Sequence, residues 1–109
     1  MHQDHVSFMA SLTQKRRVRL VFHSKEDATD LARTCAPLDY GPSRQAHDKA
    51  PRYHFWDYDS DQAPHPLSLL PAQIVLIEGT TDAFDPGEFI TWDMNERPWF
   101  TPRDWGTFS

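Results

Sequence analysis

Cysteine is almost missing from this chain: Cys35 is the only one among 109 residues, so no intrachain disulfide can form. A single cysteine is typical of proteins from a reducing compartment. Long hydrophobic runs are missing too, because the longest strongly apolar run covers only residues 74–77, against the roughly 20 residues of a membrane helix. The N-terminus has no basic start followed by an apolar run, and so predicts no signal peptide. We expect a cytoplasmic protein with no membrane association.

Glycine is also scarce, and the motifs built on it are absent. The four glycines are not clustered, which excludes a P-loop and a Rossmann fingerprint, and there is no Gly-x-Ser-x-Gly motif. None of the six histidines has the spacing of a zinc motif with Cys35, and no His-Glu-x-x-His occurs. We therefore predict no cofactor, no metal and no catalytic residue, and interpret the protein as a binding module rather than an enzyme.

Aromatic residues and proline are abundant. The chain holds seven Phe, four Trp, three Tyr and nine Pro, which is typical of one ordered domain built from short elements. Charge is uneven, since residues 1–52 hold nine Lys and Arg against six Asp and Glu, and residues 53–109 hold two against ten. The basic stretch Lys15-Arg16-Arg17 with Arg19 offers a local site for anions; the alternative is a solvated helix end.

The N-terminal residues predict a helix. Asp4 is a suitable N-cap for a helix to about Arg16, whose apolar stripe at helical spacing consists of Val6, Met9 and Leu12. The basic residues 15–17 would then lie near its C-terminus, where the helix dipole favours cations.

Alternating and β-branched segments predict five strands, over residues 18–23, about 31–38, 53–58, 67–69 and 73–78. Residues 24–30 form a turn in this interpretation, although a helix over 25–35 is the alternative. We expect a loop over 39–52 and a turn over 59–64. The last strand is apolar on both faces, which predicts a central or covered position.

The C-terminal part predicts a short helix and an aromatic tail. Asp85-Pro86 is typical of a helix start, and Phe89, Ile90 and Trp92 supply its apolar side. We expect the tail, residues 93–109, to pack back on the domain, because exposed aromatics favour aggregation.

The core is predicted from the apolar strand positions. We expect five side chains to be buried together: Leu20, Phe22, Phe55, Leu69 and Ile74. Cys35 precedes Ala36 and Pro37, which favours an inert, buried strand cysteine over a catalytic thiol.

Several short segments carry a family resemblance. They are Arg17-Val18-Arg19-Leu20-Val21-Phe22, Ala36-Pro37-Leu38, Tyr53-His54-Phe55, Leu67-Ser68-Leu69 and Phe84-Asp85-Pro86. In this order, and over about residues 5–92, the chain resembles the WYL domain family. The resemblance implies a mainly β, α+β fold: a small SH3/Sm-like β-barrel of about five strands with an N-terminal helix and a short C-terminal helix. Residues 1–92 would form this WYL-like domain, and the aromatic tail would pack on it.

The candidate binding site combines the aromatic strand with basic residues. His54 and Trp56 share one face of the strand, opposite Tyr53 and Phe55, and aromatic faces can stack on bases. Ser68 stands where the family has a ligand-binding arginine. The predicted site therefore consists of Arg17, Arg19, Arg52, His54, Trp56 and Ser68. The alternative is that both faces of the strand are buried.

The resemblance implies a ligand-binding or regulatory module that senses a nucleotide or single-stranded nucleic acid. A module that binds a protein partner, or a homodimer, through the aromatic tail or a sheet edge is the second hypothesis. A small hydrolase built on His/Asp pairs is the third.

Overall fold

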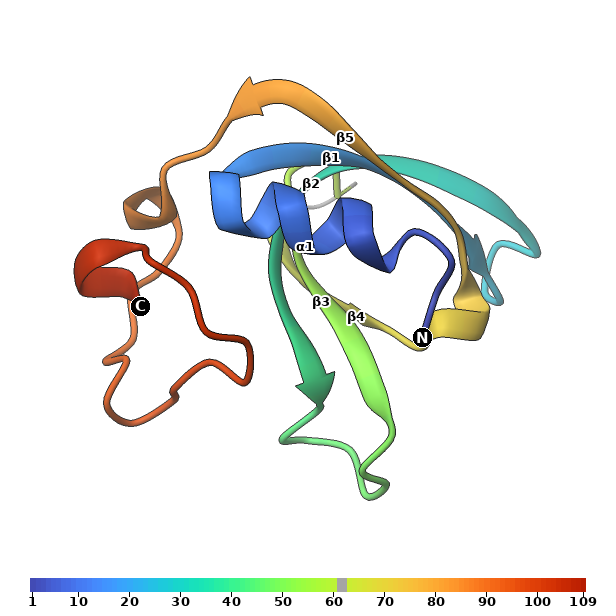
Figure 1. Ribbon diagram of the computed structural model, residues 1–109. Coiled ribbons are helices and arrows are strands. Elements are labelled where there is room, and N and C mark those ends of the chain that lie inside the picture. Colours follow the sequence, from blue (N-terminus) through green and yellow to red (C-terminus); the bar gives the residue numbers. More distant parts are fainter. Residues whose placement is uncertain (61–62) are drawn as a thin grey trace.

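A single antiparallel sheet and one α-helix make up the fold of the computed structural model, which describes residues 1–60 and 63–109. The elements are α1 (His5–Gln14), β1 (Arg16–Ser24), β2 (Thr29–Pro42), β3 (Pro51–Asp57), β4 (His65–Leu69) and β5 (Ile74–Ala83). Three 3₁₀ turns follow or separate them: η1 (Pro71–Gln73), η2 (Pro86–Glu88) and η3 (Gly106–Phe108). The strand order is β4-β3-β2-β1-β5, and the sheet curves round α1 (Figure 1).

The mainly β, α+β class is as predicted, but the sheet is not closed. β4 and β5 lie at its two ends, and no pairing joins them in the described part of the chain. Within the same residues, no helix is long and apolar enough to span a membrane.

The hairpin of β1 and β2 decides between the two interpretations of residues 24–30. β1 ends at Ser24 and β2 begins at Thr29, so the predicted turn is confirmed, although it spans only 25–28, and the alternative helix over 25–35 is wrong. β2 runs on to Pro42 and β3 begins at Pro51, so the predicted loop over 39–52 is wrong at both ends and spans only 43–50. The added residues are held by pairing of Tyr40 with Tyr53 beyond a register shift after Pro37. The predicted turn over 59–64 includes residues 61–62, which lie outside the described residues.

The buried face of the helix matches the predicted one in part. Leu12 is fully buried and Met9 packs against the core as predicted, but Val6 is 79% exposed and Phe8, which was not predicted, is fully buried. α1 ends at Gln14 because Lys15 adopts the left-handed conformation with φ 55°, and Arg16 already belongs to β1. The basic residues therefore mostly lie on a strand and not at a helix end.

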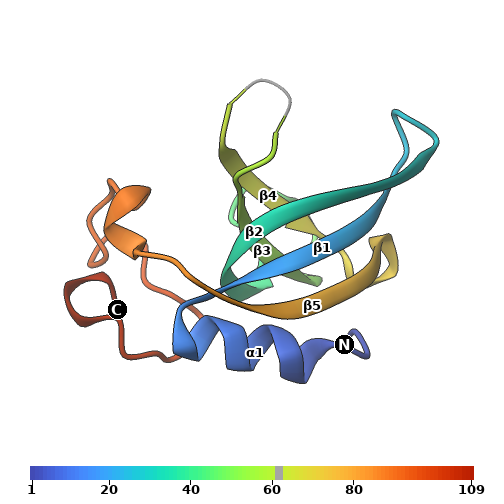
Figure 2. The same ribbon diagram turned by 90° about the horizontal axis from the view of Figure 1, so that it is seen from above.

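β5 is an edge strand, although its apolar sequence predicts a central or covered one. Its outer side is partly covered by the N-terminal segment, since the Asp4 carboxylate accepts a hydrogen bond from the Ile77 amide at 2.9 Å. His2 Nε2 donates to the Ile74 carbonyl, also at 2.9 Å. The helix runs alongside the same strand (Figure 2). Asp4 precedes α1 as predicted, but its side chain bonds β5 instead of capping the helix.

The core lies between α1 and the sheet. All five predicted core residues are buried in one cluster, which confirms that prediction. Phe8 joins the helix to the sheet, with ring centroids 4.9 Å from Tyr53 and 5.4 Å from Phe55.

The segment after β5 starts as predicted but does not continue as an α-helix. The Asp85 side chain accepts a hydrogen bond from the Gly87 amide at 3.0 Å, and the turn η2 ends at Glu88. Phe89 and Ile90 are nevertheless buried. Their burial places the beginning of the C-terminal segment against the sheet.

Candidate functional site

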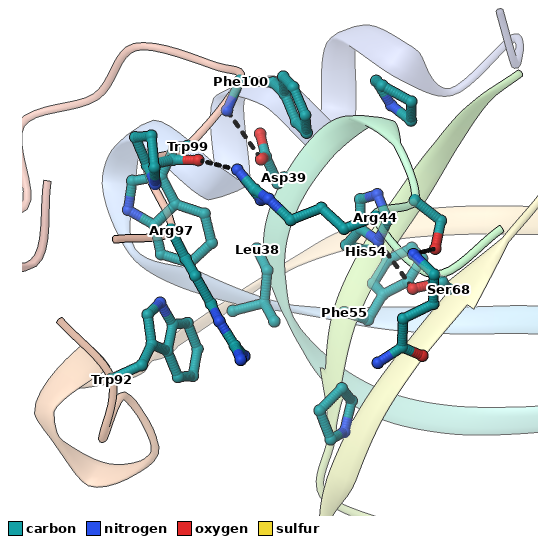
Figure 3. Close-up of a pocket in the computed structure, with 15 residues that line it drawn as sticks. Leu38, Asp39, Arg44, His54, Phe55, Ser68, Trp92, Arg97, Trp99 and Phe100 are labelled. Carbon is teal, nitrogen blue, oxygen red and sulfur yellow. Dashed lines mark hydrogen bonds between the residues drawn. The ribbon is translucent and has the colours of Figure 1, made fainter. Parts of the chain in front are cut away.

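A pocket of about 280 Å³ lies between the sheet and the C-terminal segment (Figure 3). Strand residues form one wall, and the tail and the loop after β2 form the others. We call it the tail pocket; its lining residues are Leu38, Asp39, Pro42, Ser43, Arg44, Gln45, His54, Phe55, Pro66, Ser68, Trp92, Arg97, Pro98, Trp99 and Phe100. Its volume is near the lower end of the range for small-molecule sites.

Asp39 fastens the tail to β2 and so forms this pocket. Its Oδ2 accepts a hydrogen bond from the Phe100 amide at 2.9 Å, and its Oδ1 accepts one from the Thr101 amide at 3.0 Å. The Tyr40 amide and Arg103 Nη2 also donate to Oδ1, at 2.9 and 3.2 Å. The carboxylate is buried, and these four donors offset the cost of removing it from water.

Arg103, which belongs to the tail, is the ion-pair partner of Asp39. Its side chain is fully buried, with the guanidinium 4.0 Å from the ring centroid of Trp99 and 4.4 Å from that of Trp105. It also donates to the carbonyls of Leu38 and Thr101. Burial lowers the pKa of Arg103 to about 10, although the Asp39 carboxylate acts in the opposite direction. The Asp39–Arg103 pair therefore sets the position of Trp99.

Two other arginines make the tail pocket cationic. Arg44 reaches from the loop after β2 to the tail, where its Nη2 donates to the Pro98 carbonyl at 2.8 Å (Figure 3). Its guanidinium also lies 5.0 Å from the centroid of the Phe100 ring. Arg97 lines the pocket from the tail and is exposed. Among the lining residues that the structure describes, Asp39 is the one carboxylate, and its oxygens already accept four hydrogen bonds.

His54 and Ser68 face each other across β3 and β4 in the same pocket. The Ser68 hydroxyl oxygen is 2.7 Å from His54 Nδ1, and the Gly41 carbonyl is 2.9 Å from His54 Nε2. The two residues are register partners, which explains their proximity. The structure thus brings together two of the six predicted site residues.

The other four predicted residues lie outside the tail pocket. Trp56 stacks on Phe89, with centroids 5.2 Å apart and planes at 14°. The Arg17 guanidinium lies 4.3 Å from the ring centroid of Tyr58.

The last two are Arg52 on β3 and Arg19 on β1. Arg52 forms an ion pair with Asp48 at 3.0 Å, and its side chain is 14% exposed. Arg19 is exposed on β1. Neither is among the described residues that line the tail pocket, so these two predicted charges do not join His54 there.

Most of the residues that form the pocket were not among the predicted site residues. Arg44 and Arg97 carry its charge, and Trp92, Trp99 and Phe100 supply its aromatic walls. The many aromatic residues of the tail indicated that it packs on the domain. Asp39, whose carboxylate binds the tail amides, lay in a segment predicted to be a loop.

Comparisons with models of known protein families, with curated proteins and with solved structures find no match to this chain. The fold and the site therefore define the protein at a coarse level, as a small, mainly β, α+β protein with a cationic, aromatic-walled pocket.

Cys35 is fully buried, as predicted, and burial together with nearby Asp57 raises the pKa of its thiol. Since the thiolate is the reactive form, we expect the native protein to resist thiol reagents. The measurement is labelling with Ellman's reagent in buffer and in denaturant. Stoichiometric reaction in denaturant should contrast with essentially none in buffer, and equally fast labelling in both would contradict the inertness of this thiol.

Proposed function

We propose that the protein is a ligand-binding module whose tail pocket takes a small anionic molecule with a flat ring, of the nucleotide class. The observation that carries this proposal is the pairing of Arg44 and Arg97 with aromatic walls in one pocket. Guanidinium groups suit phosphate because they can donate two parallel hydrogen bonds. Aromatic side chains add stacking of roughly 1–3 kcal/mol per base.

The charge balance of the pocket supports an anion rather than a cation. The saturated Asp39 carboxylate has few acceptor sites left for a ligand, whereas Arg44 uses one nitrogen on Pro98 and Arg97 is exposed. An anion at this position would therefore meet two guanidinium groups. The negative charge of the rest of the chain would oppose binding at long range, so we expect modest affinity.

A compact ligand is favoured over an extended single strand. A single-stranded nucleic acid that lay along β3 would have to stack on the face of Trp56 that Phe89 covers. Its phosphates would have to bind the Arg52 guanidinium, which is paired with Asp48. The tail pocket needs no such rearrangement.

The fold part of the proposal is that the curved sheet is a divergent small barrel of the SH3/Sm type, as in WYL domains. The element order supports it, since one helix precedes five antiparallel strands and β5 returns beside β1. The curvature of the sheet round α1 is in keeping with it (Figure 1). A regulatory role in response to the ligand follows from the same resemblance.

Titration with adenosine and uridine monophosphates, followed by tryptophan fluorescence, tests the proposal. We expect binding that weakens with salt, and Arg97→Ala should weaken it about tenfold, the loss of one charge-assisted hydrogen bond. Arg19→Ala removes an exposed arginine on β1 and is the matched control. No binding at low salt, or an equal effect of the two variants, would refute the proposed site.

A protein-binding module is the second candidate, because Phe100 remains 47% exposed at the mouth of the pocket. Concentration-dependent assembly without any nucleotide, abolished by Phe100→Ser, would favour it.

A further inference from the structure

We propose that Ser68 is a nucleophile in the tail pocket, with His54 as its base, and that it reacts with aryl esters of carboxylic acids. The proposal rests on hydrogen-bond geometry and goes beyond binding, because a nucleotide need not contact Ser68 for the binding module to work.

The hydrogen bonds of His54 determine which ring nitrogen carries the proton. The Gly41 carbonyl can only accept, so His54 Nε2, 2.9 Å away, must be the donor. In the neutral ring Nδ1 is then an acceptor, and Ser68 Oγ, 2.7 Å away, donates its proton to it. The serine hydroxyl is thus hydrogen-bonded to a base, and the Gly41 carbonyl fixes the tautomer and orientation of that base.

This is the arrangement that nucleophilic catalysis requires: a hydroxyl, a base within hydrogen-bond distance and a third group that orients the base. Gly41 lies at the end of β2, His54 on β3 and Ser68 on β4, so three neighbouring strands of one sheet hold the groups. Sites on strands are held more rigidly than sites on loops.

The surroundings fit an ester with an aromatic part. Ser68 is exposed, so a substrate can reach its hydroxyl without any opening of the structure. Trp92, Trp99 and Phe100 offer apolar contact to an aryl group, and the positive charge of Arg44 and Arg97 in the same pocket favours the negative charge that develops on attack.

The reaction would proceed in two steps. Ser68 Oγ attacks the carbonyl carbon while its proton passes to His54 Nδ1; the bond from the carbonyl carbon to the aryl oxygen breaks, and the phenol leaves with that proton. Water then attacks the acyl-serine, gives a proton to Nδ1, and the serine oxygen takes it back as the carboxylic acid departs. No metal, oxidant or reductant is needed.

Covalent labelling tests the nucleophile directly. An alkyl fluorophosphonate should add to Ser68 with loss of fluoride, and intact mass with peptide mapping should place one adduct on that residue. p-Nitrophenyl acetate should in parallel release nitrophenol with an acetyl group on Ser68. Absence of any adduct, or an adduct on another residue, would overturn the proposal.

Three variants separate catalysis from structure. Ser68→Ala should abolish the adduct. His54→Gln keeps a donor for Gly41 and an acceptor for Ser68 but has no basic nitrogen, so labelling should slow at least about tenfold while the thermal midpoint stays the same. His65→Asn changes an exposed histidine on β4, the strand that carries Ser68, and should label at the rate of the unmodified protein.

Equal labelling of His54→Gln and the unmodified protein would reduce the pair to a structural contact between β3 and β4. Nucleotide binding measured on Ser68→Ala reports separately on the binding proposal, because that variant keeps Arg44, Arg97 and the aromatic walls.

Discussion

Replacing Arg103 with alanine is expected to lower the free energy of unfolding by about 3–5 kcal/mol, the effect of removing one partner of a buried ion pair. The variant leaves the Asp39 carboxylate buried without its countercharge and removes the guanidinium that lies over the rings of Trp99 and Trp105. Urea denaturation followed by tryptophan fluorescence measures the change.

Arg97→Ala is the matched control for this prediction, because Arg97 is exposed in the same tail and should change stability by no more than about 0.5 kcal/mol. Since Arg103 fixes Trp99, nucleotide binding should also fall in Arg103→Ala under conditions where the protein is folded. A loss of stability below about 1 kcal/mol would show that the tail is not held by this pair.

Phe8→Ala should destabilise the protein by about 3–5 kcal/mol, as truncations of buried phenylalanine do. Its ring is fully buried and makes edge contacts with Tyr53 and Phe55, so alanine would leave a cavity where the helix meets the sheet. Thermal and urea unfolding report the change.

Val6→Ala is the control for Phe8→Ala, since Val6 lies on the same helix and is 79% exposed. It should change stability by no more than about 0.5 kcal/mol. If Val6→Ala were the more destabilising of the two, the exposure of Val6 and the burial of Phe8 would both be contradicted.

The strands could be predicted because the alternation of apolar and polar residues in their sequences matches the alternation of burial in the structure. In β1 and β3 buried residues alternate with half-buried or exposed ones, and the five predicted core positions are all buried. The helix phase was not predictable from its apolar residues alone, because Val6, Phe8, Met9 and Leu12 permit more than one stripe. Only the position of β3, distant in sequence, makes Phe8 the residue that faces the core.

The site was less predictable, for a physical reason. His54 and Ser68 could be selected because each lies on a predicted strand, and strand pairing brings them together. The rest of the pocket depends on Asp39 meeting amides more than 60 positions later in the chain, a contact that leaves no local pattern. An aspartate close to glycine and proline, as Asp39 is to Gly41 and Pro42, favours a loop locally. In the structure the amides of the tail bind the Asp39 carboxylate and so stabilise it at a buried position of β2.

The N-terminal residues that bond β5 also have a consequence for self-association. An edge strand with free amides and carbonyls is a template on which the same strand of another copy can pair. The Asp4 carboxylate accepts a hydrogen bond from the Ile77 amide, and the His2 ring donates one to the Ile74 carbonyl. Both bonds lie at the most apolar part of β5. These two side chains therefore help to keep copies of the protein from adding to one another edge to edge, and a cleavable tag is better placed at the C-terminus than in front of them.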